Sequence, residues 1–152
     1  MLRQYRALVA SLALLVGPTV PASAEDLRAA MEEANARFLN AFNRPDPAGF
    51  AGLYTPDAIL LFQGVPPKIG PDAITQFWES RIKTGAKNHT FEIINAWADG
   101  KYAYQIAKAG VQLIPQSGER IVISGYTVRI FERQDDGTWK AKMHMFNRQD
   151  GL

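Results

Sequence analysis

The segment Ile121–Asn147 constrains the fold more than any other part of the chain, because it has the pattern of two long strands joined by a tight turn. The turn is Asp135-Asp136-Gly137, in which glycine adopts positive φ without Cβ strain and aspartate tolerates or caps such turns. The flanking residues are rich in β-branched and aromatic side chains, which suit a half-buried strand. We therefore expect an antiparallel hairpin around which the rest of the chain is arranged.

The length of this turn decides which side chains share a face, because neighbouring residues of a strand point to opposite faces. With a two-residue loop, the face of Tyr126 also carries Val128, Met143, Met145 and Asn147. With a three-residue loop, in which Gly137 forms a bulge, the face of Tyr126 and Val128 carries His144 and Phe146 instead. The two-residue loop gives the cleaner apolar face, so the pattern alone slightly favours a surface position for His144.

The N-terminal 24 residues have the pattern of a secretory signal peptide. A start with Arg3 and Arg6 precedes the apolar run Ala7–Val16 and the small-residue sequence Ala22-Ser23-Ala24. The run is too short to span a hydrocarbon core, which needs about 20 apolar residues. We expect cleavage before Glu25, which divides the chain into a signal peptide, residues 1–24, and one mature domain, residues 25–152.

Cleavage changes the charge of the protein, because the signal peptide contains two arginines and no acidic residue. Of the 17 lysines and arginines, 17 − 2 = 15 remain beside 15 aspartates and glutamates. A formally neutral domain with dispersed charges gives no reason to expect nucleic-acid binding. The chain also has no cysteine, which excludes disulfides, thiol nucleophiles and a lipid-anchored cysteine. We expect a periplasmic or secreted domain that leaves the membrane after cleavage.

Periodicity along the mature chain places helices first and strands afterwards. Apolar residues at three- and four-residue intervals predict a helix over residues 25–43. Proline and glycine signals predict two more helices, over residues 47–54 and 71–85. Strands are expected over residues 58–62, 91–97 and 102–114, ahead of the hairpin. This order predicts an α+β domain in which a curved antiparallel sheet closes over the helices.

Four segments in this order carry a resemblance to a known superfamily: Arg37–Asn43, Phe50–Ala58, Gly70–Trp78 and Asp136–Lys140. They resemble the nuclear transport factor two-like superfamily, and more narrowly its SnoaL-like and ketosteroid-isomerase-like branch. The resemblance covers essentially the whole mature chain. It implies a cone-shaped, cystatin-like fold, in which a curved antiparallel sheet wraps around three N-terminal helices and leaves an apolar pocket.

The resemblance to ketosteroid isomerase does not extend to its catalytic groups. That enzyme uses a carboxylate base with a tyrosine and a protonated aspartic acid that bind the oxyanion. The tyrosine position falls on Phe38, and the base position falls at or beside Phe62, where no carboxylate is present. The aspartic acid position falls on Tyr126, which can still donate a hydrogen bond. Steroid isomerisation by that mechanism is therefore not expected.

The same comparison implies a pocket for a small apolar molecule. Its expected ligand-binding residues are Phe38, Tyr54, Phe62, Trp78 and Phe146. By their spacing from Gly137, the resemblance places His144 and Phe146 on the pocket side, so we expect an inward His144. His144 and Tyr126 are the candidate catalytic residues, His144 as an acid or base and Tyr126 as a donor to an oxyanion. Any such activity would be a cofactor-free isomerase, lyase or hydrolase reaction. We expect no metal site, because His89 and His144 are not clustered in the sequence.

An inward His144 would turn an apolar stripe outward, consisting of Trp139, Ala141, Met143 and Met145. Exposed stripes of this kind usually mark interfaces, so we expect a homodimer through the outer face of the sheet. The alternative function is a non-catalytic homodimeric association module, whose cavity is filled by its own aromatic residues.

Overall fold

The computed structural model describes residues 23–44, 47–116 and 118–149, so most of the expected signal peptide lies outside the described residues. Within these ranges the chain forms three helices: α1 (Ala24–Asn43), α2 (Pro47–Ala51) and α3 (Pro71–Lys83). It also forms six strands: β1 (Tyr54–Phe62), β2 (Lys68–Ile69), β3 (Ala86–Asp99), β4 (Tyr102–Leu113), β5 (Ile121–Arg133) and β6 (Trp139–Arg148). The strand predicted from residue 58 therefore begins four residues earlier, and the short strand β2 lies in a segment expected to be a loop.

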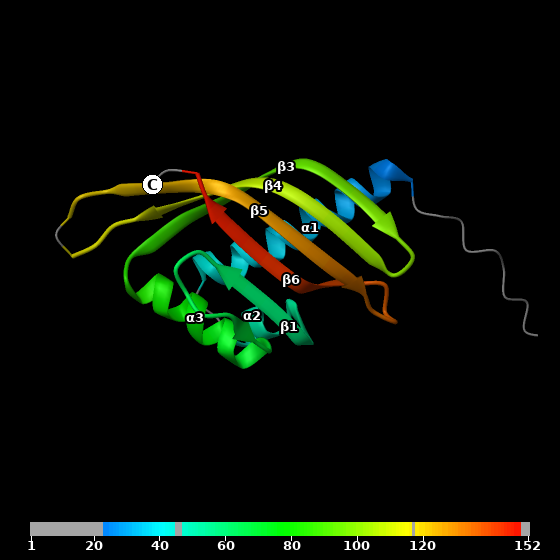
Figure 1. Cartoon of the computed structure of the whole chain (residues 1–152), viewed down its shortest axis with the longest axis horizontal. Helices are drawn as coiled ribbons and strands as arrows, with labels where there is room; N and C mark the ends of the chain where they lie inside the picture. The colour runs from blue at the N-terminus through cyan, green and yellow to red at the C-terminus, as the bar shows by residue number, and fades with distance from the viewer. Residues whose placement is uncertain (1–22, 45–46, 117, 150–152) are drawn as a thin grey trace, which may run out of the picture.

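The strands form one curved sheet in the order β2-β1-β6-β5-β4-β3. Strand β1 runs parallel to β6, and all the other neighbouring pairs are antiparallel. Figure 1 shows the long strands β3–β6 curving together, with α1 lying across them and α2 and α3 gathered near β1. The predicted α+β class, with a curved sheet around N-terminal helices, is confirmed.

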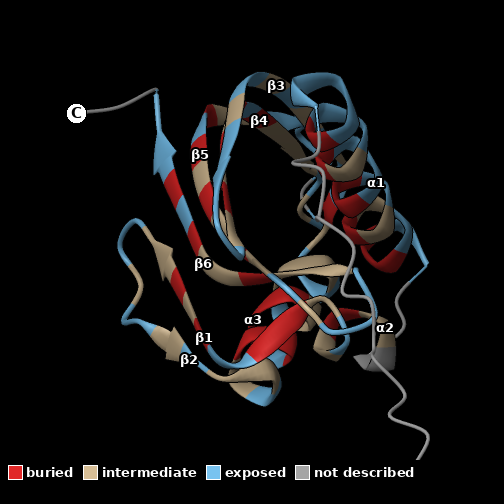
Figure 2. Cartoon of the chain, turned by 90° about the vertical axis from the view of Figure 1, so that its right-hand side faces the viewer, coloured by how far each residue is buried: buried red, intermediate tan, exposed pale blue. Residues whose placement is uncertain are grey.

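Helix α1 forms where the sequence repeats apolar residues every three or four positions, and this stripe faces the sheet. Its buried residues include Leu27, Met31, Phe38 and Phe42. The helix packs mainly against β3. In Figure 2 the buried residues of α1, α3 and the long strands line the interior between these elements. The aromatic side chains of α1 are thereby directed toward the concave side of the sheet.

Helix α3 begins where the sequence predicts it. Pro71 takes the first helical position, where its missing N–H costs nothing, and Gly70 precedes it with φ of 81°. Ile74, Phe77 and Trp78 are buried on one side of the helix. Helix α3 packs against α2, β1, β2 and β3.

The hairpin between β5 and β6 has the three-residue loop that was one of the two alternatives. Gly137 has φ of 83° and donates its N–H to the carbonyl of Gln134, and the Gln134 N–H donates to the Thr138 carbonyl. Arg133 pairs with Trp139 directly outside the loop. A second irregularity follows within β6, because Phe131 pairs with Ala141 whereas Ile130 pairs with Met143. Lys142 is therefore an extra residue that forms a β-bulge.

This bulge changes which residues share a face. Beyond it, Arg129 lies opposite His144, and Tyr126 lies opposite Asn147. His144 is inward and only 2% exposed, whereas Tyr126 is 44% exposed on the outer face. The expected inward position of His144 is confirmed, and the expectation that Tyr126 shares its face is wrong.

The same bulge shortens the apolar stripe expected on the outer face of β6. Ala141 is buried in the core, and Trp139 packs against that core. Only Met143 and Met145, which follow the bulge, lie on the outer side with Ile130 and Val128. The prediction that Trp139 and Ala141 face outward is therefore wrong, because one inserted residue reverses the alternation along the strand.

Candidate functional site

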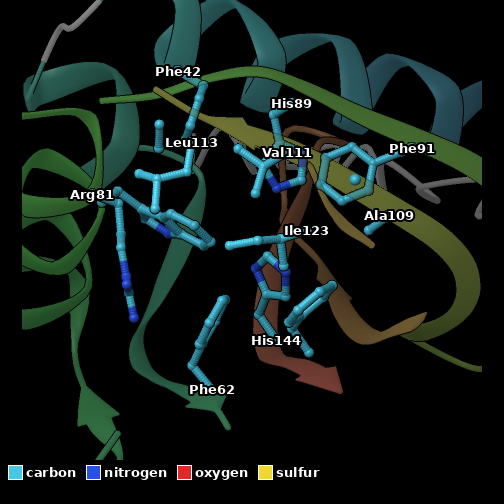
Figure 3. A pocket seen from close by; sticks show the side chains of 14 residues that line it. Phe42, Phe62, Arg81, His89, Phe91, Ala109, Val111, Leu113, Ile123 and His144 are labelled. Atoms are coloured by element: carbon cyan, nitrogen blue, oxygen red, sulfur yellow. The ribbon is translucent and has the colours of Figure 1, made fainter. Parts of the chain in front are cut away.

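A cavity of about 50 Å³ lies inside the curve of the sheet, enclosed by α1, α3 and strands β1 and β3–β6. Its walls are mostly apolar, with aromatic side chains from five elements: Phe42, Phe62, Trp78, Phe91 and Phe146. Small residues of β4, including Ala109 and Gly110, leave the space open. Figure 3 shows His89 and His144 reaching the cavity from different strands. An apolar cavity with a few polar groups is the usual form of a small-molecule site.

His144 is held by a chain of buried hydrogen bonds from α3 through β1 to β6. The indole Nε1–H of Trp78 donates to the Tyr54 hydroxyl oxygen over 3.0 Å. The same hydroxyl lies 3.1 Å from Nδ1 of His144. Because the Tyr54 hydrogen has no other acceptor in the described chain, Tyr54 donates it to Nδ1. The remaining hydrogen of the neutral imidazole is then on Nε2.

Burial keeps both ends of this pair uncharged. Desolvation lowers the pKa of His144 well below its usual value, and the positive charge of Arg129 lowers it further. Desolvation raises the pKa of Tyr54, so its hydroxyl stays protonated at neutral pH. His144 is therefore a neutral side chain at this site, which carries a hydrogen-bond donor on Nε2.

His89 is a site residue that the sequence analysis missed. Lys87 pairs with Gln112 and Thr90 pairs with Gly110, so β3 contains one extra residue between these pairs. Asn88 has φ of 52° within this bulge, and the side chain of His89 is directed into the cavity. No periodicity marks such a bulge; the only local signal was an asparagine, which tolerates positive φ more readily than most residues.

The pKa of His89 is also lowered, to about 3, first by desolvation and then by the charge of Arg129. Its Nδ1 atom is buried and has no hydrogen-bond partner among the residues that the structure describes. Its ring packs 5.2 Å from the ring of Phe38 and 4.6 Å from that of Phe91. The cavity thus holds two neutral histidines, and one of them has an unused ring nitrogen.

Three of the five expected ligand-binding residues line the cavity: Phe62, Trp78 and Phe146. The other two lie behind its walls, because Phe38 packs against Trp78 and Tyr54 contacts His144 from the side away from the cavity. Tyr126, expected as a catalytic donor, lies on the opposite face of the sheet. The structure therefore brings His144 together with His89, and not with Tyr126.

The rim of the cavity carries one cation. The guanidinium carbon of Arg81 lies 5.2 Å from the ring centroid of Phe62 and 5.1 Å from that of Phe77. Such cation–π contacts hold the side chain in place, and Figure 3 shows Arg81 among the residues that line the cavity. No acidic side chain is among the residues that line the cavity. Among the described residues, no group of three or more His, Asp or Glu side chains gathers to form a metal site.

Aromatic side chains fill most of the interior around this space. The ring centroids of Phe62 and Phe146 are 5.0 Å apart, and those of Phe38 and Trp78 are 5.1 Å apart. The open volume that remains has room for a few water molecules, since one water needs about 10–15 Å³. The predicted aromatics therefore form a continuous cluster, but they do not close the cavity completely.

The sequence profile of the SnoaL-like domain matches residues 35–141, which is most of the chain. No curated protein matches this chain. In the described part of the chain, no helix is long and apolar enough to span a membrane.

Solved structures of distant sequence share the fold. A ketosteroid isomerase-like protein from Erwinia carotovora atroseptica has a TM-score of 0.72 at 21% identity, with coverage of 84% of this chain and 98% of that chain. A nuclear transport factor 2-like superfamily protein from Salmonella enterica serovar Typhimurium has a TM-score of 0.72 at 12% identity, covering 86% and 96%. A protein from Novosphingobium aromaticivorans, described as NTF2-like with a cystatin-like fold, has a TM-score of 0.71 at 19% identity, covering 84% and 85%. At these identities, the likeness establishes the fold.

Proposed function

This chain belongs to the SnoaL-like domain family, and from this premise we propose that its mature domain binds a small, largely apolar molecule in the cavity between α3 and the sheet. The observation that carries the proposal is the combination of an apolar wall with two neutral histidines. Apolar walls supply affinity through burial, and a few polar groups fix orientation. The cavity of about 50 Å³ fits a small molecule, and a larger one requires movement of Arg81 or its neighbours at the rim.

The preferred ligand would carry a hydrogen-bond acceptor, such as a carbonyl oxygen. His144 offers the Nε2–H because Tyr54 occupies its Nδ1. A buried donor that remains unpaired costs about 1–3 kcal/mol, so a ligand that satisfies it gains affinity over a pure hydrocarbon. Ketones, lactones and quinone-like aromatics have this chemistry.

Binding is better supported than proton transfer. A general base works best when its pKa lies near the operating pH. His89 has a pKa of about 3, and His144 is also shifted downward, so neither accepts a proton readily at neutral pH. With Tyr126 on the outer face, the catalytic pair expected from the sequence is not assembled. The acid–base role of His144 stays a prediction that a ligand-dependent activity would have to establish.

A thermal-shift screen of the mature protein, residues 25–152, tests the binding proposal. Small lactones, aromatic ketones and steroids should be compared with hydrocarbons of the same shape. A ligand at about 100 times its dissociation constant should stabilise the fold by roughly 2.7 kcal/mol. The acceptor-bearing member of each pair should give the larger shift, and the absence of any shift across these classes would count against a ligand site.

A cavity-filling variant separates specific binding from surface adsorption. Ala109→Leu adds apolar volume to the wall, because Ala109 lines the cavity and is only 2% exposed. Ala98→Leu adds the same atoms at an exposed position of β3. We expect the first variant to lose the ligand shift and the second to keep it. Equal shifts in both variants would mean that the ligand binds elsewhere.

We also propose a homodimer through the outer sheet face, which is the basis of the alternative function as an association module. Its support is an outer apolar band, defined as Trp97, Tyr104, Tyr126, Val128 and Met145. Trp97 and Tyr126 are each 44% exposed and Met145 is 38% exposed. Large apolar side chains exposed together on one face commonly mark an interface.

We further propose that the protein acts in the periplasm or outside the cell. The support is the signal-peptide pattern of residues 1–24 together with the lack of cysteine. N-terminal sequencing of the exported protein should find Glu25 as the first residue. An intact N-terminus in the cytoplasmic fraction would contradict this location.

A further inference from the structure

An open groove of about 360 Å³ runs along α3, on the side that faces the short strand β2. Its lining includes Lys68 of β2 and the α3 residues Gln76, Ser80 and Arg81. Arg81 also lines the apolar cavity that contains His144, and it is the one described residue that the two spaces share. Arg81 therefore marks the boundary between a closed apolar space and an open polar one.

Two aromatic rings hold the guanidinium group of Arg81 at this boundary. Its guanidinium carbon lies 5.2 Å from the ring centroid of Phe62, a cavity residue, and 5.1 Å from that of Phe77, a groove residue. Ring contacts of this kind use the flat faces of a guanidinium, whereas its N–H donors project from the edges. A side chain that is already held in place loses less conformational entropy when it binds a partner. Arg81 is therefore prepared to donate hydrogen bonds to a ligand.

The positive charge of Arg81 has no acidic partner in the described part of the chain. The ion pairs found there involve Arg28, Lys101 and Lys142. No aspartate or glutamate lines either the cavity or the groove, and Lys68 adds a second positive charge to the groove. A carboxylate matches this environment, because its two oxygens can accept two parallel hydrogen bonds from one guanidinium.

We propose that the ligand of the apolar cavity is a monocarboxylate, whose apolar body lies in the cavity and whose carboxylate binds Arg81 where the groove begins. This inference rests on the proposed function and names the chemical class of its ligand. Arg81 is only partly buried, so the carboxylate keeps contact with water and avoids the large cost of full desolvation. Lys68 is a second cation beside the same groove and favours an anion there through its charge.

Pairs of carboxylates and their methyl esters test this proposal by isothermal titration calorimetry at pH 7. Benzoate, phenylacetate and hexanoate are suitable probes, because carboxyl groups titrate near about pH 4 and are ionised at pH 7. In at least one pair the mature protein should bind the carboxylate about tenfold more tightly than the ester, as hydrogen bonds to a charged group allow. This advantage should decrease with added salt, because the groove is open to solvent.

Two variants of α3 assign the effect to one residue. Arg81→Gln should abolish the advantage of the carboxylate but still bind the ester, which also shows that the variant is folded. Lys83→Gln removes a positive charge from an exposed position of the same helix, outside both spaces, and should keep the advantage.

Three results would overturn the proposal. Equal affinity of the wild-type protein for carboxylate and ester would show that the cavity binds apolar bodies without recognising the charge. An advantage that survives Arg81→Gln would place the carboxylate elsewhere. In both cases the proposed apolar ligand site would stand, whereas binding of neither the carboxylates nor the esters would count against that site as well.

Discussion

Tyr54 occupies the centre of the buried hydrogen-bond chain, so loss of its hydroxyl should lower the stability of the fold. In Tyr54→Phe, the indole N–H of Trp78 and Nδ1 of His144 both lose their partner. A buried polar group without a partner costs about 1–3 kcal/mol, so we expect the free energy of unfolding to fall by roughly that amount or more. Urea denaturation of the mature protein measures it.

The matched control is Tyr104→Phe, which removes a hydroxyl from a half-buried tyrosine on the outer face. It should change the free energy of unfolding by less than about 0.5 kcal/mol.

The direction of the hydrogen bond between Tyr54 and His144 can be tested separately. The ¹⁵N chemical shifts of the wild-type imidazole should place the hydrogen of His144 on Nε2. A hydrogen on Nδ1 of His144 would show that the hydrogen bond between Tyr54 and His144 runs in the opposite direction.

The two neutral histidines make the stability of the protein depend on pH. Their folded pKa values are below the unfolded value of about 6.5, so the unfolded chain binds protons that the folded chain does not. Stability should therefore be full above pH 6.5 and fall as the pH decreases below it. Well below pH 6.5 the loss approaches about 1.4 kcal/mol per pH unit for each histidine.

The contribution of the histidines to stability is best measured between pH 6.5 and pH 4.5. The carboxylates whose pKa is lowered, such as Asp57 and Glu132, lose their contribution at lower pH. Urea unfolding at steps of 0.5 pH unit should show the decline, and His89→Asn should make it shallower. A flat profile in the wild-type protein would mean that both histidines titrate normally.

At the residue scale, the sequence could identify His144 as a candidate but could not pair it correctly. Its inward position followed from its spacing from Gly137, together with the resemblance to known proteins. Its true neighbours, Tyr54 and His89, come from strands far away in the sequence. Tyr54 was expected to bind the ligand, and it instead contacts Nδ1 of His144 without lining the cavity.

At the element scale, the turn of the β5–β6 hairpin depends on Gly137. Its φ of 83° is unfavourable for residues with a Cβ, and an added Cβ would meet no atom within 4 Å. Gly137→Ala should therefore destabilise the domain by about 1 kcal/mol through backbone strain alone. Gly137→Asn should cost less, because asparagine tolerates positive φ better. Chemical denaturation compares the two, and equal losses would argue against a left-handed requirement.

The two β-bulges explain why the strand patterns did not correctly predict which side chains face the interior. The turn was predictable from Asp135-Asp136-Gly137, since its chemistry is local, but these residues left its length open between two and three. The extra residue Lys142 leaves no such signal; it is accommodated by contacts across the sheet, where its amine pairs with Asp57 and Glu132. A bulge depends on neighbouring strands, so periodicity within one strand does not reveal it.

At the scale of the whole molecule, the order of elements was enough to predict the architecture. Helices followed by long antiparallel strands can bury their apolar faces in few ways, and the amphipathic pattern of α1 already showed which face is covered. The cavity was less predictable, because its size depends on how closely Phe62, Trp78 and Phe146 pack. Of the four residues predicted for the outer apolar stripe, Met143 and Met145 lie on the outer face, whereas the bulge at Lys142 leaves Trp139 and Ala141 on the inner side.

The outer apolar band gives a prediction about assembly. Val128 lies within the band, paired with Met145 and with Ile106 on its other side. Val128→Lys introduces a charge that a packed interface would have to desolvate, which is costly without a partner. If copies of the chain associate through this face, the wild-type protein should have twice the mass of a single chain at micromolar concentration, and the variant should have the mass of one chain. Sedimentation equilibrium measures both.

The control for this experiment is Ile121→Lys, because Ile121 is 42% exposed and lies at the start of β5, outside the band. It adds the same charge to an exposed apolar position and should leave the dimer intact. A monomeric wild-type protein would remove the case for an association module, because that function requires the band to be covered. A dimer that survives Val128→Lys would place the interface on another surface. The ligand cavity opens on the opposite side of the sheet, so either result leaves the thermal-shift test of binding unaffected.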